Sequence, residues 1–97
     1  MTKIEDKLVK EAHVFLHPIR FRIVELLAEG PMHINEISKA VGEERRIVSY
    51  HLRTLEEYGF VNSKYEISEN PKSKGRAIRK YWVTGKVDEV ISELKKI

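Results

Sequence analysis

Residues 44–60 read ERRIVSYHLRTLEEYGF, and their apolar side chains recur with the period of an α-helix. Three of them form one apolar stripe: Val48, Leu52 and Leu55. Five polar or basic side chains project elsewhere: Arg45, Arg46, Ser49, Tyr50 and Arg53. The spacing predicts a helix from about Glu44 to Tyr58, which Gly59 ends, with Phe60 placed to touch Leu55 as in a Schellman cap. This helix has an apolar inner side and a basic outer side.

A short helix is predicted directly before this segment. Ile34, Ile37 and Val41 have helical spacing over about two turns, and Gly42 ends them. Two short helices joined by a turn with a glycine, the second carrying a basic outward face, are typical of a helix-turn-helix. A helix of this kind fits the major groove of DNA and can present side chains to base edges.

Two further helices are predicted toward the amino end. The first runs from about Lys3 to Leu16, with Thr2 and Glu5 at capping-box spacing. His17-Pro18 ends it, because a residue before proline is pushed out of the helical region while the proline suits the start of the next helix. Gly30-Pro31 then ends the second helix.

After Phe60 the period of the apolar side chains changes from 3.6 to 2, which predicts a β-hairpin. Its arms are Val61 to Ile67 and Arg79 to Val83, and turn-forming residues dominate between them. A last helix follows over Lys86 to Ile97. The expected fold class is mainly α with a β-hairpin wing (α+β), a winged helix-turn-helix. Four helices precede the hairpin and one follows it, in a single domain over residues 1–97.

The basic residues gather near the turn of the hairpin. The chain has 18 Lys and Arg against 15 Asp and Glu, a net charge of +3. Five basic residues and no acidic residue lie between Pro71 and Lys80, whereas basic and acidic residues cancel in the last helix. A cationic loop beside a helix-turn-helix indicates a polyanionic partner, and double-stranded DNA is the one we expect.

Composition excludes several classes of protein. Cysteine is absent, which excludes a disulfide scaffold, a thiolate metal site and a cysteine nucleophile. No apolar run approaches the roughly 20 residues that span a bilayer, so we expect a cytoplasmic protein without a membrane partner. Glutamine is also absent while Lys, Glu and Arg are abundant, a bias seen in proteins of hot habitats.

The four histidines raise the alternative of a metal or catalytic site. His13 and His17 are four residues apart, but no second pair of ligands is near, so an interfacial or capping role is preferred. His33 is expected at the start of the third helix, and His51 half-buried, bonded to backbone or phosphate. Ser49 and His51 do not form a nucleophile and base, because residues two apart on a helix do not face each other. We therefore expect no metal, no cofactor and no enzymatic activity.

Three segments carry motifs in a defined order. Residues 49–61 read SYHLRTLEEYGFV, residues 17–23 read HPIRFRI, and Gly75-Arg76 precedes Tyr81-Trp82-Val83. They resemble the S-x-H-L-x-x-L-x-x-x-G-L-V, D-P-x-R-x-x-I-L and G-R…Y-x-L motifs of ArsR-like winged-helix repressors. The resemblance covers about Phe15 to Val83. It implies a symmetric homodimer that binds an operator and represses transcription until an effector or stress relieves the repression.

The resemblance also implies which residues contact DNA. The predicted helix from about Glu44 to Tyr58 corresponds to the recognition helix of that family. Its DNA-contacting residues are Arg45, Arg46, Ser49, Tyr50 and Arg53. On the wing they are Lys72, Lys74 and Arg76. An arginine can bond O6 and N7 of one guanine, and the wing cations suit phosphates, with Arg76 a candidate for the minor groove.

The apolar stripes of the first and last helices could close the core of a monomer, but their width at opposite ends of the chain favours a shared dimer interface. Its expected residues are Ile4, Leu8, Phe15, Val87, Val90, Ile91 and Leu94. Metal-sensing relatives use cysteines on the third helix or Asp and His on the last. This chain has no cysteine, and its last helix has no histidine. Metal sensing is therefore not expected, and the effector is unknown.

The function expected is sequence-specific binding of a pseudo-palindromic DNA site by a homodimeric regulator, a repressor by resemblance. The alternative is a winged-helix module that binds protein or structured RNA within a larger assembly, because a wing can serve that purpose too.

Overall fold

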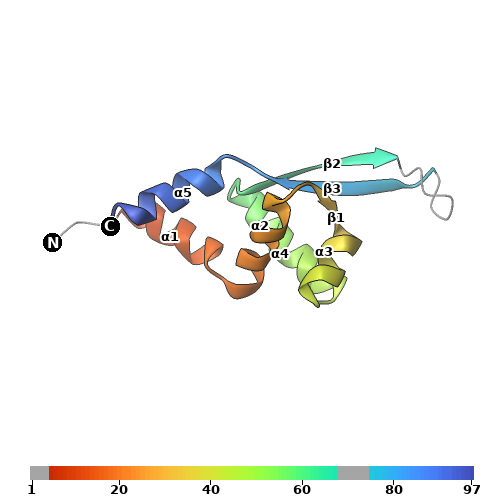
Figure 1. The fold of residues 1–97 in the computed structure, drawn as a ribbon, viewed down its shortest axis with the longest axis horizontal. Helices are drawn as coiled ribbons and strands as arrows, with labels where there is room; N and C mark the ends of the chain where they lie inside the picture. The colour runs from red at the N-terminus through yellow and green to blue at the C-terminus, as the bar shows by residue number, and fades with distance from the viewer. Residues whose placement is uncertain (1–4, 68–74) are drawn as a thin grey trace.

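The computed structural model describes residues 5–67 and 75–97, and it confirms the predicted winged helix-turn-helix (Figure 1). The elements in chain order are α1 (Asp6–Phe15), α2 (Pro18–Ala28), β1 (Met32–His33), α3 (Ile34–Val41), α4 (Arg45–Glu57), β2 (Val61–Ile67), β3 (Ala77–Val83) and α5 (Lys86–Lys95). Helices α1 and α5 lie side by side at one end, and the β2–β3 hairpin extends toward the other.

Local sequence signals set the helix ends. Pro18 occupies the first turn of α2, and the side chain of His17 caps that helix by accepting a hydrogen bond from the Ile19 N–H at 3.2 Å. At the end of α4, the N–H groups of Gly59 and Phe60 donate to the carbonyl oxygens of Glu56 and Leu55 at 3.0 and 2.9 Å. This is the predicted Schellman arrangement, and Gly59 adopts the left-handed φ of 80° that it requires.

The structure describes α1 from Asp6 onward. Its N-cap is Glu5, whose side chain makes no capping hydrogen bond. Thr2, the other expected member of a capping box, lies outside the described residues, as does Ile4.

The sheet has three antiparallel strands in the order β1-β3-β2. In the hairpin, Val61 pairs with Val83, Ser63 with Tyr81 and Tyr65 with Arg79, so the predicted strand faces coincide. Strand β3 begins at Ala77, two residues before the predicted start. The short β1 was not predicted, because two residues are too few to show an alternating pattern.

One hydrophobic core joins every helix to the base of the sheet. The rings of Phe21 and Phe60 lie 5.5 and 5.6 Å from that of Phe15, between α1, α2 and the end of α4. An ion pair of 2.6 Å between Lys86 Nζ and Glu11 Oε2 holds α5 against α1. The helix-turn-helix is therefore anchored to the same core as the terminal helices.

Three residues expected at the dimer interface are buried in this core, which leaves them little surface for a partner. Phe15, Val87 and Val90 are 2%, 7% and 4% exposed in the single chain. Their helices pack against each other and against the rest of the protein, so one side of each apolar stripe is covered within the monomer. Leu8, Ile91 and Leu94 lie at the edge of the core and are only partly buried.

Candidate nucleic-acid interface

Helix α4 has a basic outer face, and its apolar inner face is fully buried. Val48, Leu52 and Leu55 are 0% exposed, which fixes the helix on the core. Of the five α4 residues predicted to contact DNA, Ser49 is half-buried and the other four are exposed: Arg45, Arg46, Tyr50 and Arg53. The structure thus brings all five onto one outward surface. The side chain of Arg46 is 91% exposed, and its nearest carboxylate oxygen, on Glu44, is 3.9 Å away.

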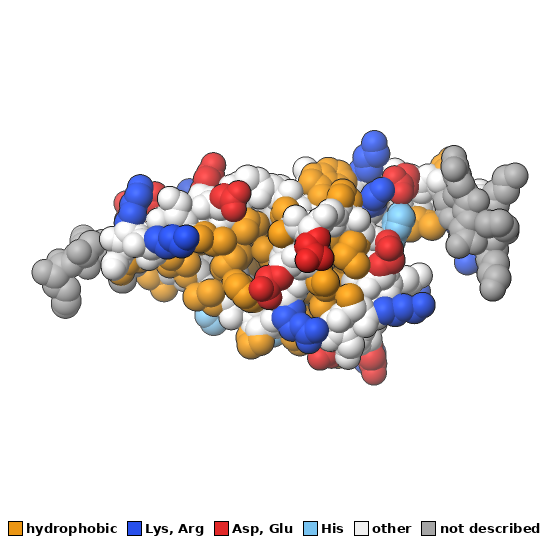
Figure 2. All heavy atoms as spheres, in the orientation of Figure 1, with side chains coloured by type: hydrophobic (Ala, Val, Ile, Leu, Met, Phe, Trp, Pro, Cys, Tyr) orange, Lys and Arg blue, Asp and Glu red, His pale blue; other side chains and the backbone are white. Residues whose placement is uncertain are grey.

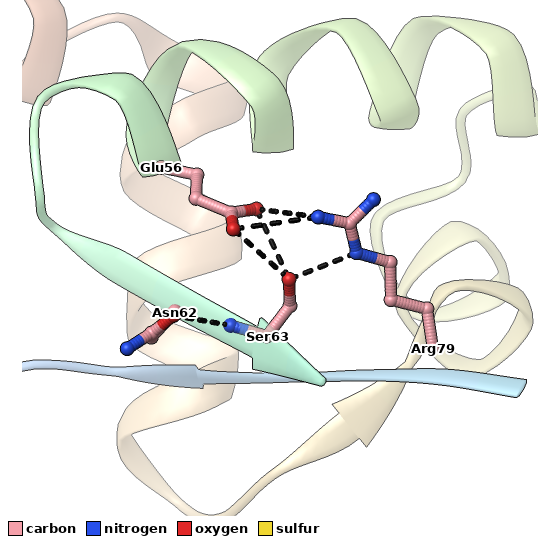
Figure 3. A network of polar contacts seen from close by, with 4 residues as sticks. All are labelled: Glu56, Asn62, Ser63 and Arg79. Carbon is pink, nitrogen blue, oxygen red and sulfur yellow. Dashed lines mark hydrogen bonds and ion pairs between the residues drawn. The ribbon is translucent and has the colours of Figure 1, made fainter. Parts of the chain in front are cut away.

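A groove separates α4 from the hairpin. Its walls are Ser49, Arg53, Glu56, Glu57, Arg79 and Tyr81. A polar network closes the floor of this groove and joins the helix to both strands (Figure 3). Arg79 Nε donates to Ser63 Oγ at 2.8 Å, Ser63 Oγ donates to Glu56 Oε2 at 3.0 Å, and an Arg79 terminal nitrogen lies 3.3 Å from Glu56 Oε1.

Aromatic rings complete this connection. The guanidinium of Arg79 lies 5.4 Å from the centre of the Tyr65 ring and 5.6 Å from that of Tyr81. Burial raises the pKa of the Tyr81 phenol above its ordinary value, so the ring stays neutral beside Arg79 at physiological pH. The base of the wing is thereby fixed relative to the recognition helix.

This network neutralises part of the positive charge that the sequence places on the wing. Arg79 was one of five basic residues between Pro71 and Lys80, but its charge is engaged with Glu56. Lys80 Nζ lies 3.7 Å from Glu66. Arg76 is exposed. Lys72 and Lys74 lie outside the described residues, so the DNA-contacting role expected of them stays a prediction.

We expect Glu56→Gln to lower the free energy of unfolding by about 1 kcal/mol, because it removes the charge that pairs with Arg79 in a half-buried site. Urea denaturation measures this loss. Glu57→Gln is the matched control, since Glu57 is exposed on the next position of the helix. Equal stability of the two variants would contradict the structural role of the network.

On the opposite face of the hairpin, His33 connects β2 to the start of α3 through polar contacts with two glutamates. Its backbone N–H donates to Glu36 Oε1 at 3.0 Å at the start of α3, where the sequence placed it, and its Nε2 lies 2.9 Å from Glu66 Oε1 on β2. Glu36 has a lowered pKa, chiefly from the hydrogen bond of the His33 backbone. Glu66 has a lowered pKa from the His33 side chain and nearby Lys80. Contacts on both faces therefore hold the hairpin at a fixed angle to α4.

His51 is bonded differently from the prediction. It is 6% exposed, and Arg20 Nε donates to its Nδ1 at 3.0 Å, so its partner is a side chain of α2 rather than backbone or phosphate. The His17 ring lies 4.6 Å away. Burial, followed by the charges of His17 and Arg20, lowers the pKa of His51 below 6.5. Sequence reasoning missed Arg20, although HPIRFRI was one of the motifs that it singled out.

We expect the protein to lose stability as the pH falls below about 6.5, the ordinary value for histidine. His51 binds a proton more readily in the unfolded chain, so its contribution is complete above that pH and declines below it until the folded pKa is reached. Urea midpoints at pH 7.5 and 5 measure the decline. Replacing His51 by Phe should make it smaller, whereas replacing exposed His13 by Ala should not. An unchanged decline in the His51 variant would contradict this assignment.

Metal and membrane sites receive no support from the described part of the chain. Among residues 5–67 and 75–97, no group of three His, Asp or Glu side chains could hold a metal ion. His17 has the capping role that the sequence favoured. No helix in these two ranges is long and apolar enough to cross a membrane.

Residues 17–63 match the family model described as bacterial regulatory protein, arsR family. A structure described as a "possible transcriptional regulator for arsenical resistance" is 25% identical, with a TM-score of 0.68 over 96% of this chain and 83% of that one. The transcriptional repressor BigR from Xylella fastidiosa is 22% identical, with a TM-score of 0.71 over 94% and 82%. A homodimeric winged helix-turn-helix DNA-binding domain from Mycobacterium bovis is 18% identical, with a TM-score of 0.68 over 98% and 87%. No curated protein matches the chain.

Proposed function

Because residues 17–63 of this chain form an ArsR-family helix-turn-helix within a winged-helix fold, we propose that the protein is a transcriptional regulator, a repressor, that binds a pseudo-palindromic DNA operator as a homodimer. The observation that carries the proposal is that Arg45, Arg46 and Arg53 are exposed on α4 while the apolar face of this helix is buried. The adjacent hairpin is held to α4 by the ion pair between Arg79 and Glu56. One of the structures named above is described as a transcriptional repressor and two as possible transcriptional regulators, and no catalytic step is proposed.

In this proposal α4 enters the major groove, which is about 12 Å wide and admits one helix. Arg46 and Arg53 then reach base edges, where an arginine can bond two acceptors of one guanine. The hydroxyls of Ser49 and Tyr50 contact a base or a phosphate. Arg45 lies at the first turn of α4, and its guanidinium contacts the DNA there.

The wing follows the DNA backbone into the neighbouring groove. Arg76 is exposed beside the start of β3 and is suited to a narrow minor groove, where the negative potential is strongest. Lys72 and Lys74 are proposed to contact phosphates. The ties of Glu56 and His33 to the hairpin support this arrangement, because they fix the direction in which the wing projects.

The dimer is proposed to form through the terminal helices. Figure 2 shows hydrophobic side chains gathered over the end of the molecule where α1 and α5 lie. The partly buried members are Leu8, Ile91 and Leu94, and Val9 and Leu16 on α1 are 52% and 56% exposed. Ile4 lies outside the described residues. The Mycobacterium bovis domain of similar fold is described as homodimeric, which supports this assignment.

The test compares ligands under one salt condition. Fluorescence anisotropy with a genomic duplex, an RNA hairpin and a single strand should give the tightest binding for the duplex, and sedimentation should give twice the mass of the 11.4 kDa chain. A monomer that prefers the RNA hairpin would instead favour the alternative, a module that binds RNA or protein within an assembly.

A further inference from the structure

A buried cation lies beside α4, and no carboxylate among residues 5–67 and 75–97 pairs with it. Arg20 on α2 is only 8% exposed, and its Nε donates to His51 Nδ1. In the part of the chain that the structure describes, none of the carboxylate ion pairs involves Arg20. A guanidinium is costly to bury without an anion, and an uncharged side chain could fill the same space. The charge of Arg20 therefore points to an anion supplied from outside the chain.

The tip of Arg20 can reach such an anion. Every buried side-chain nitrogen or oxygen atom in the described residues has a hydrogen-bond partner. Within the described ranges, Nε is the one Arg20 side-chain atom that makes a hydrogen bond, so its two terminal nitrogens are not sealed from solvent. With Nε held by His51, these nitrogens form a fixed fork of donors, the geometry that binds a phosphate through two parallel hydrogen bonds. The low pKa of His51 helps to keep it a neutral acceptor for Nε.

Arg20 and the wing lie on opposite flanks of the recognition helix. On one flank, Ser49 and Glu56 line the groove beside the hairpin. On the other, His51 is bonded to Arg20, and the Tyr50 ring centre lies 5.9 Å from the Arg20 guanidinium carbon. Tyr50 is 58% exposed and borders the DNA-facing surface. A helix seated in the major groove has one phosphate backbone on each side, and the wing serves only one of them.

We propose that Arg20 is a phosphate-binding residue that holds the DNA backbone on the flank of α4 opposite the wing. This inference rests on the proposed DNA binding and adds a contact outside the recognition helix and the wing. The contact fixes the depth and tilt of α4 without reading sequence, because phosphates are the same at every base pair. Its neighbours His17, Tyr50 and His51 are not carboxylates, so none of them would repel a phosphate as an acidic side chain does.

The test is the salt dependence of duplex binding by Arg20→Met and Arg20→Lys. Methionine keeps the buried stem without the charge, so the slope of log affinity against log salt should become shallower by about 0.9 for each protomer, or about 1.8 for a dimer. The loss should be equal for operator and unrelated duplexes. Lysine should retain most of the slope. Lys95→Met, at an exposed position on α5, removes the same charge and should leave the slope unchanged.

Thermal melting of Arg20→Met shows whether the variant is folded. If it is not, the Nε–Hε NMR resonance of Arg20 in the wild-type protein, assigned by its absence from Arg20→Lys, decides the question. It should shift when a duplex is added. A folded Arg20→Met with the wild-type slope, or an unmoved resonance during saturating binding, overturns the inference while leaving DNA binding intact. Wild-type protein that binds no duplex overturns the proposed function itself.

Discussion

Arg46→Ala is expected to weaken binding to the operator by about 1 to 3 kcal/mol for each protomer, or roughly 2 to 6 kcal/mol for a dimer. The Arg46 side chain is almost fully exposed, and the Glu44 carboxylate beside it lies 3.9 Å away, at the limit of an ion pair, so the guanidinium can reach a base edge. An arginine that bonds O6 and N7 of a guanine discriminates strongly against other bases. The variant should therefore also lose discrimination at one position of each half-site.

Competition binding with operator variants measures both effects. The fold should be unaffected, because alanine is a strong helix former and Arg46 is fully outside the core. Lys95→Ala serves as the control for the loss of one positive charge. Equal losses on operator and unrelated duplexes would make Arg46 a phosphate contact, and no loss at all would remove it from the interface.

Leu94→Asp is expected to separate the dimer and to lower operator affinity by about 10²- to 10⁴-fold, because each half-site is then bound without the help of a linked partner. Leu94 lies on α5 one helical turn after Ile91, and both side chains are partly buried at the edge of the core. A carboxylate in the proposed interface would be buried without a partner.

Sedimentation and anisotropy on the same sample test this prediction. Lys95→Asp introduces the same residue at the next position, which is exposed, and should stay dimeric. A Leu94→Asp protein that remains a dimer with unchanged affinity would show that the interface lies elsewhere. A circular dichroism spectrum that matches the wild type would show that the monomer is folded.

Local patterns were sufficient for most elements of the fold. The stripe of Val48, Leu52 and Leu55 specified α4 to within one residue at each end, and the left-handed Gly59 specified its cap. The alternation from Val61 to Ile67 specified a strand with the observed bounds. These features depend on residues close together in the chain, where periodicity and turn chemistry act directly.

The contacts between elements could not be predicted in the same way. Arg20 meets His51 across 31 positions, and Glu56 meets Arg79 across 23. Periodicity tells which face of an element is inside, but not which side chain of another element meets it. Arg79 was therefore counted among the cations facing DNA, and Arg20 was overlooked.

The residues expected at the dimer interface could not be divided between core and surface for a related reason. The stripe on α5 includes Val87, Val90, Ile91 and Leu94, which cover a broad sector of the helix. A stripe of that width can face the core of its own chain and a partner at the same time. Only the packing of α1 against α5 shows that Val87 and Val90 face the core, and Ile91 and Leu94, which are partly buried, are the ones proposed to face a partner.

Selection of bound fragments from the source genome tests the central claim most directly, since one recovered motif reports both sequence preference and symmetry. The wild-type protein should enrich an inverted repeat whose half-site centres lie about 10 base pairs, or roughly 34 Å, apart, as two recognition helices on one face of the duplex require. Enrichment of no motif, or of one without twofold symmetry, would contradict a dimeric operator-binding regulator.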